Sequence, residues 1–158
     1  MIFAALGTHP QPMDRLVRAL DSIARSSPDE AIVIQSAVFG YQPTRCQILS
    51  VIAHAELDAR MREASVIITH GGPSLIMAAL ALGRRPIVVP REPRFGEHVD
   101  GHQAQFAVWL AERRPIRVVL DVDDLSGSIA EVRALGPAEA TSRGPSREVV
   151  ARLTQIIG

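Results

Sequence analysis

The chain has 158 residues, 17 basic and 17 acidic groups, a formal net charge of zero and one cysteine, a length that fits one domain burying roughly 70% of its unfolded surface. Because phosphate-backbone binding needs several clustered cations, this neutral chain without cationic runs is not expected to bind nucleic acid. A single cysteine excludes an intrachain disulfide and a thiolate cluster, which favours a reducing, intracellular setting, and the absence of lysine excludes lysine-based catalysis.

Strands and helices alternate along the first half of the chain. The short apolar run at 2–6 predicts a buried strand. It is not expected to be a signal peptide, because it lacks a basic flank and a cleavage site. Helical periodicity predicts an amphipathic helix over 12–25. The next expected elements are a strand at 31–34, a weaker strand at 48–53 and a short helix at 55–64.

The second half repeats this alternation. It predicts strands at 66–68, 86–89 and 116–120, each followed by a helix, at 74–82, 100–112 and 123–134. Charged residues are absent from 66–82, but the turn residues Thr69 to Pro73 argue against a membrane span there. We expect a domain over 1–135, a flexible link over 136–145 and an amphipathic helix over 146–158. Continuous apolar strands that alternate with helices predict an α/β fold with a parallel sheet covered on both faces.

Three loops are candidates for a ligand site, because open parallel sheets bind ligands beyond the carboxyl ends of their strands. The clearest runs from Thr69 to Ser74, with Gly71 and Gly72 before a helix that begins near Pro73. Glycines permit close approach of a ligand, and the N–H groups of a helix N-terminus favour a diphosphate. An equally weighted alternative is a tight turn in which glycine only permits the geometry. The segment is neither a P-loop nor the three-glycine dinucleotide motif.

The loop Gly7-Thr8-His9 is a second glycine turn after a strand, so it is expected at the same edge of the sheet. His9 has the chemistry to contact a phosphate or to shuttle a proton. Capping of the next helix is an equally good interpretation of this histidine.

The third loop, 90–103, is rich in arginine, acids and histidine, a set suited to hydrogen bonding with sugar hydroxyls. His98 and His102 are four residues apart, with Glu97 and Asp100 nearby, so metal ligation has to be weighed. Without a further ligand set, the sequence favours a site that holds no metal.

An Asp-x-Asp pair at Asp121 and Asp123 is similar to motifs that hold a metal-bound nucleotide sugar. Its position before a helix favours capping by Asp123 or Asp124 instead. No nucleophile and base stand together in the sequence, which favours group transfer assisted by electrostatics over covalent catalysis.

Three separated motifs resemble glycosyltransferase family 28, in particular the stand-alone C-terminal-domain proteins of its bacterial exopolysaccharide group. They are Gly7-Thr8-His9-x-Gln11-Pro12-x-Asp14-Arg15-Leu16, Thr69-His70-Gly71-Gly72-Pro73, and Pro90-Arg91 followed by Phe95-Gly96-Glu97-His98-Val99-Asp100-x-His102-Gln103. The resemblance implies the C-terminal half of a GT-B fold, a single Rossmann-like domain with about six strands. It also implies inverting, metal-independent transfer from a UDP-sugar without a cofactor, with a helix N-terminus neutralising the departing UDP.

The resemblance also implies roles for individual residues. The nucleotide diphosphate would be bound by Gly7, Thr8, His70, Gly71, Gly72 and Ser74. The donor sugar would be bound by Glu97, Asp100, His102 and Gln103. His9 and His98 are candidate catalytic residues, although the catalytic base is expected to come largely from a partner. Many relatives carry a glutamate for the ribose hydroxyls where this chain has Ala78.

The expected function is therefore that of the donor-binding subunit of a two-component glycosyltransferase. It would move a hexose or uronic acid to a polyprenyl-diphosphate-linked acceptor in exopolysaccharide synthesis, in the cytoplasm at the inner membrane. The acceptor half would be a membrane-associated subunit, docked through the helix 146–158 and its apolar stripe, unless that stripe packs on the chain's own sheet. A non-catalytic enhancer or scaffold subunit is the alternative, and the short chain argues against a two-domain UDP-sugar epimerase.

Overall fold

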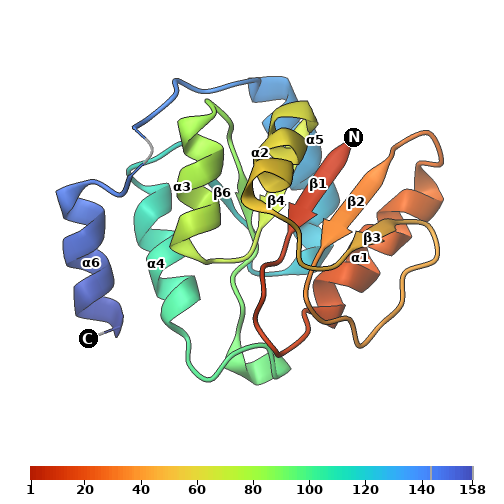
Figure 1. Cartoon of the computed structure of the whole chain (residues 1–158), viewed down its shortest axis with the longest axis horizontal. Helices are drawn as coiled ribbons and strands as arrows, with labels where there is room; N and C mark the ends of the chain where they lie inside the picture. The colour runs from red at the N-terminus through yellow and green to blue at the C-terminus, as the bar shows by residue number, and fades with distance from the viewer. Residues whose placement is uncertain (143, 158) are drawn as a thin grey trace.

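The sheet of this protein has six strands, all parallel (Figure 1). The computed structural model describes residues 1–142 and 144–157. The strands are β1 (Ile2–Ala5), β2 (Ile32–Gln35), β3 (Gln47–Leu49), β4 (Val66–Thr69), β5 (Ile87–Val88) and β6 (Arg117–Val118). Their spatial order is β3-β2-β1-β4-β5-β6, which confirms the expected parallel α/β fold.

The order of the strands determines where a ligand site can form. The chain moves outward from β1 to β3 and then returns to pair β4 with the other side of β1. In register, Ala5 pairs with Gln35 of β2 on one side and with Thr69 of β4 on the other. The direction in which successive strands are added therefore reverses between β1 and β4. This is a topological switch point, and open α/β sheets bind ligands in the loops beside it.

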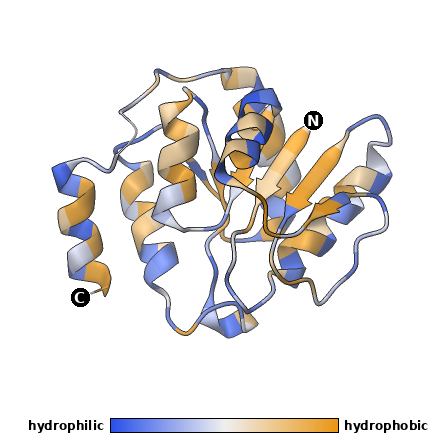
Figure 2. Cartoon of the chain, viewed as in Figure 1, coloured by the Kyte–Doolittle hydropathy of each residue, from blue (hydrophilic) through white to orange (hydrophobic). Residues whose placement is uncertain are grey.

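Helices cover both faces of the sheet. On one face lie α1 (Asp14–Ser26) and α5 (Leu125–Leu135), and on the other α2 (His54–Glu63), α3 (Pro73–Ala81) and α4 (His102–Ala111). The apolar strands are sandwiched between these layers (Figure 2). Along β1, Ile2 and Ala4 face the α1 side while Phe3 faces the α2 side, because successive side chains of a strand alternate. No helix of the described residues is long and apolar enough to cross a bilayer.

The two last strands are shorter than their apolar runs predict. Pro86 and Pro90 flank β5, and Pro115 precedes β6. Proline has no N–H group for the ladder. One bond continues beyond each strand, from Val89 N–H to Thr69 and from Val119 N–H to Val88.

The expected helix at 123–134 also begins differently. Residues Val122–Asp124 form a 3-10 turn, η2, before α5. The capping side chain is Asp121, which accepts a hydrogen bond from Asp123 N–H at 3.0 Å. Asp124 occupies the position before α5 without capping it. The prediction of a cap by Asp123 or Asp124 was wrong, because the inserted turn moves the free N–H groups toward Asp121.

The last helix, α6 (Arg147–Ile157), packs on α4 of its own domain (Figure 1). Val149 is buried, and Leu153 and Ile156 pack against the same apolar cluster. Only Val150 and Ile157 of the predicted stripe are largely exposed. The stripe as a whole is therefore not available to a partner subunit, which corrects the docking expectation.

The link before α6 runs alongside the C-terminal end of α3 and is hydrogen-bonded to it. Ala138 N–H donates to Gly83, and Thr141 N–H donates to Leu80. These hydrogen bonds attach part of the expected flexible link to the domain. Arg143, within the link, and Gly158, at the end of the predicted helix, lie outside the described residues.

Two carboxylates of α1 hold the long loop between β2 and β3. Asp14 Oδ1 accepts hydrogen bonds from the N–H groups of Gly40 and Tyr41, at 3.0 and 2.9 Å. Asp21 is fully buried, and its Oδ1 accepts from the N–H groups of Thr44 and Arg45, at 2.9 and 2.8 Å. These contacts position the chain that enters β3 and then reaches the ligand edge of the sheet.

Candidate functional site

A pocket of about 430 Å³ lies at the switch point between β1 and β4. Its wall includes six residues predicted for the site: Gly7, Thr8, His9, His70, Ser74 and Gln103. Residues that sequence reasoning did not select also line it: Gln35, Val51, Ile52, His54, Leu57 and Leu75. The structure thus brings the loops after β1 and β4 together with the start of α4, as the parallel topology requires.

The loop after β1 is held in place by Gln35, a residue that sequence reasoning missed. Gln35 is buried, its Oε1 accepts from Gly7 N–H at 3.2 Å, and its Nε2 donates to the Ser50 carbonyl at 3.2 Å. Gly7 has φ +77°, and a Cβ there would lie 3.0 Å from His70 Nε2. Glycine is needed here both for the backbone conformation and for the approach of the His70 ring.

The loop after β4 uses its glycine N–H groups internally. Gly71 N–H donates to Gln103 Oε1 at 3.0 Å, and Gly72 N–H donates to His70 Nδ1 at 2.9 Å. A Cβ at Gly71 would lie 2.7 Å from Gln103 Cβ, so glycine is required there by packing. Both amides are therefore engaged within the protein, and neither glycine lines the pocket, so their contact with a diphosphate stays a prediction.

The first turn of α3 retains unused N–H groups at the pocket. Gly72 is the N-cap of α3 and Pro73 has no N–H group, so the next donors are the amides of Ser74 and Leu75. Among the described residues, neither amide makes a hydrogen bond. Both residues line the pocket. An anion is therefore best accommodated at Ser74 and Leu75, where the helix dipole also favours negative charge.

His70 is kept uncharged in the folded protein. Burial, followed by the positive charge of Arg91, lowers the pKa of His70 from its usual 6.5 to about 4. Because Nδ1 accepts the Gly72 N–H group, the neutral ring carries its proton on Nε2, beside Gly7. His70 thus offers a hydrogen-bond donor at the edge of the pocket.

This lowered pKa predicts a loss of stability in acid. Above pH 6.5 His70 is neutral in both states, whereas between pH 6.5 and 4 the unfolded chain binds a proton that the folded chain does not. The free energy of unfolding should therefore fall by up to about 3 kcal/mol across this window. In His70→Asn the side-chain oxygen can still accept the Gly72 N–H group, but nothing titrates. Urea unfolding at pH 7 and pH 4 should show a smaller loss in this variant, and equal losses would contradict the assignment.

Gln103 connects the three loops of the site. It is 5% exposed at the start of α4, and its Oε1 accepts N–H groups from both Gly71 and Arg91, each at 3.0 Å. Its Nε2 makes no hydrogen bond among the described residues. Gln103 therefore has a structural oxygen and an amide group still available to a ligand in the pocket.

Arg91 is a fully buried cation beneath the site, and sequence reasoning assigned it no role. Its guanidinium donates to the backbone carbonyls of Leu6, Gln11 and Glu97, at 2.9, 2.5 and 3.3 Å. Its Nε has no partner among the described residues. The sequence signals for this residue were its place in the Pro90-Arg91 motif and its position shortly after a strand at the ligand edge.

The charge of Arg91 acts on several histidines of the site. Burial is the largest cause of the lowered pKa of His9, His70 and His98, and the charge of Arg91 lowers each of them further. The same buried charge creates a positive potential beneath the pocket. In a chain without lysine, it is a source of attraction for a diphosphate.

Glu97 supports the third loop from inside. It is 1% exposed, and Arg15 of α1 donates to both of its oxygens, from Nε at 2.9 Å and from Nη2 at 3.0 Å. Glu92 N–H donates to Oε2 at 3.2 Å. Because both oxygens are engaged and Glu97 does not line the pocket, we assign it this supporting role in place of the sugar contact expected from the resemblance.

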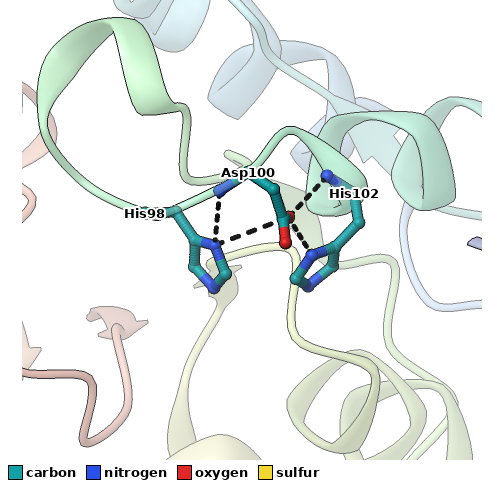
Figure 3. Close-up of side chains that lie close together, drawn as sticks. All are labelled: His98, Asp100 and His102. Atoms are coloured by element: carbon teal, nitrogen blue, oxygen red, sulfur yellow. Dashed lines mark hydrogen bonds and ion pairs between the residues drawn. The ribbon is translucent and has the colours of Figure 1, made fainter. Parts of the chain in front are cut away.

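His98, Asp100 and His102 form a polar cluster beside the pocket (Figure 3). The two histidine rings lie 4.7 Å apart, edge to face, and His98 also stacks on His9, which lines the pocket, at 4.7 Å. Asp100 Oδ1 lies 3.6 Å from His98 Nδ1, contacts His102 Nδ1 and accepts His102 N–H at 3.1 Å. That backbone bond is the largest cause that lowers the pKa of Asp100. Two of the expected sugar-binding residues, Asp100 and His102, thus lie beside the pocket, next to His98 and its stacking partner His9, although neither lines the pocket.

A second pocket of about 400 Å³ adjoins the first and shares its residues His54 and Ser74. It lies between α2 and α3, with apolar walls that include Met77 and Leu82. Ala78, which replaces the expected ribose-binding glutamate, lines this second pocket, and so does Asp58 of α2. The two pockets together can hold an elongated ligand that passes the N-terminus of α3.

Comparison with known proteins agrees with this architecture. A solved structure described as the glycotransferase of kitacinnamycin has a TM-score of 0.57 at 19% identity, covering 98% of this chain and 37% of that chain. The spinosyn forosaminyltransferase SpnP has a TM-score of 0.54 at 16% identity, covering 99% of this chain and 43% of that chain. The chain therefore spans less than half the length of either protein. At this identity the likeness shows the fold, that of the C-terminal half of GT-B glycosyltransferases.

No match is found among curated proteins. The sequence does match the model of a known domain family. The profile of the glycosyltransferase family 28 C-terminal domain matches residues 6–149, which is most of the chain. The chain belongs to the glycosyltransferase family 28 C-terminal domain family.

Proposed function

We propose that this chain is the donor-binding, catalytic subunit of a two-component inverting glycosyltransferase. It transfers a hexose or uronic acid from a UDP-sugar to a polyprenyl-diphosphate-linked acceptor in exopolysaccharide synthesis. The observation that carries the proposal is the pocket at the switch point, which is lined by residues of α3 with unused amides and by Gln103, a contact of the buried Arg91. Backbone N–H groups, a helix N-terminus and a nearby cation together favour a diphosphate.

The diphosphate is proposed to lie at the first turn of α3. Ser74 is exposed and contributes its hydroxyl and its N–H group, while Leu75 contributes a second N–H group. His70 adds its Nε2 proton from the side of Gly7. These donors also stabilise the negative charge that develops on UDP as the bond to the sugar breaks.

The nucleoside is proposed to occupy the second pocket. Its apolar walls suit a flat base, and its polar groups come from His54, Asp58 and Ser74. Ala78 cannot accept a hydrogen bond from ribose. We propose that Asp58, on the opposite helix, takes that contact, because it lines the same pocket.

The donor sugar is proposed to face Asp100, His102 and the amide group of Gln103. His9 and His98 have lowered pKa values, mainly because of burial. They are therefore neutral near pH 7 and can accept a hydrogen bond from a hydroxyl. In this proposal both histidines assist transfer, the main catalytic base comes from the partner, and no metal is required.

The acceptor half is proposed to be a separate, membrane-associated subunit, which would hold this chain at the cytoplasmic face of the inner membrane. Apolar side chains near the ligand edge support such a contact. Val51 follows β3, while Phe95 and Val99, which is 81% exposed, belong to the loop that carries His98. Together they offer apolar surface beside the site, and the α6 stripe is not needed for docking.

Calorimetry with UDP and a charge variant of Ser74 tests the proposed site. Ser74→Glu places a carboxylate in the first turn of α3, where it favours the helix but repels a diphosphate. We expect wild type to bind UDP and this variant to bind it at least about tenfold more weakly. Ser74→Gln, a neutral control of the same length, loses the hydroxyl contact but adds no charge, so it should bind UDP more tightly than Ser74→Glu. Equal UDP affinity in the Glu and Gln variants would show that the diphosphate lies elsewhere.

One observation favours the alternative of a non-catalytic enhancer subunit. The amides of Gly71 and Gly72 are satisfied by Gln103 and His70, so fewer donors face the pocket than the motif implies. Calorimetry with UDP and UDP-hexoses separates the two functions. No heat in the presence or absence of the partner would overturn the transferase and favour the scaffold.

A further inference from the structure

His98, Asp100 and His102 have the composition of a metal-binding site. Each offers one ligand atom, and the three atoms lie within 4.8 Å of one another. The close-up shows both imidazole rings on either side of the Asp100 carboxylate, within one short stretch of chain (Figure 3). The sequence placed both Glu97 and Asp100 near the two histidines and did not distinguish between these acids as ligands. The structure separates these acids, since Glu97 turns inward to Arg15.

The backbone presents these three ligands together. His102 is the first residue of α4, and its N–H group holds the Asp100 carboxylate at 3.1 Å. The Nδ1 atom of His98 faces the same carboxylate oxygen at 3.6 Å. His98 is fixed from its other side by stacking on His9. In the structure His98 Nδ1 accepts the Asp100 N–H group at 3.4 Å, a contact that a metal ion would replace.

The ligand types select among metals. Two imidazole nitrogens and one carboxylate oxygen, with a fourth position open, match zinc sites that keep one position for water or substrate. Calcium and magnesium prefer sites built from oxygen ligands. Sites with imidazole ligands bind Zn²⁺ more tightly than Mn²⁺ or Fe²⁺, and they bind Cu²⁺ more tightly still.

We propose that His98, Asp100 and His102 bind one Zn²⁺ ion beside the pocket, with the fourth position open to solvent or ligand. The proposal rests on the cluster itself and does not depend on the proposed function. If that function holds, the ion occupies the groups assigned to the donor sugar. Zinc then acts as an inhibitor of donor binding and not as a cofactor of transfer.

Titration of the full chain with ZnCl2 at pH 7.5, followed by calorimetry, tests the site. We expect one ion per chain with micromolar or tighter affinity. His98→Ala, His102→Ala and the conservative Asp100→Asn should each weaken binding at least tenfold. His54→Ala, an exposed histidine on α2, is the matched control and should stay within twofold of wild type. Magnesium chloride should produce no saturable binding.

Several results would overturn the site. They are no zinc binding by wild type, unchanged affinity in the three ligand variants, or an affinity for magnesium equal to that for zinc. Circular dichroism of each variant shows whether it is folded, and Asp100→Asn keeps the shape of the side chain if an alanine variant is not. The titration contains no nucleotide. A chain that binds zinc but not UDP would therefore support this site and overturn the proposed function, and the reverse result would do the opposite.

Discussion

Replacing Arg91 by methionine is expected to lower the free energy of unfolding by about 2–4 kcal/mol. Methionine keeps much of the length of the side chain but removes the guanidinium. The carbonyls of Leu6, Gln11 and Glu97 then lose their charge-assisted hydrogen bonds in a buried place. Removing the buried charge relieves some desolvation cost, which keeps the estimate below the sum of the three bonds.

The same variant should change the site electrostatically. Without the nearby charge, the pKa values of His9, His70 and His98 should all rise, and the affinity for UDP should fall. NMR titration of the histidine rings measures the first effect and calorimetry the second. Arg94→Met is the control, since Arg94 is exposed and pairs only locally with Glu92. If both variants behaved alike, the buried charge would have no special role.

Asp21→Ala is expected to cost about 3–4 kcal/mol of folding stability, a large effect for a residue outside the pocket. Burial by itself would raise the pKa of Asp21, but hydrogen bonds from Tyr41 and from the backbone of Arg45 and Thr44 lower it. Alanine leaves those two N–H groups without a partner and removes the acceptor of the Tyr41 hydroxyl. Urea unfolding measures the loss.

Asp21→Asn is a sharp control for this prediction. Its Oδ1 can still accept both N–H groups, and its amide can donate to the Tyr41 oxygen. The contacts of Oδ2 with Arg25 and with the Thr44 hydroxyl are lost. We expect a cost of about 1 kcal/mol for this variant. A loss as large as that of alanine would show that the charge, and not the hydrogen-bonding pattern, anchors the loop.

The sequence predicted which loops carry the candidate site but not the contacts that each residue makes there. It chose Gly71, Gly72 and Glu97 because residues of these types contact ligands in similar motifs. In the structure Gln103 and His70 bind the two glycine amides, and Arg15 binds Glu97. A hydrogen bond between residues far apart in the chain leaves no local pattern. Among the described residues, the amides at the start of α3 that make no hydrogen bond are those of Ser74 and Leu75, which motif spacing does not reveal.

The sequence by itself determined the order and type of the elements and the parallel sheet, because apolar periodicity and glycine turns are local and repeat along the chain. It also placed the loops after β1 and β4 at one edge of the sheet, since parallel strands end there together. Only the tertiary structure decided that α6 packs on α4, that Arg91 lies buried beneath the pocket, and that Asp100 joins two histidines. Burial and pairing depend on which surfaces meet in three dimensions. The sequence of an arginine or of an apolar stripe is the same whether it is exposed to solvent or buried against another part of the protein.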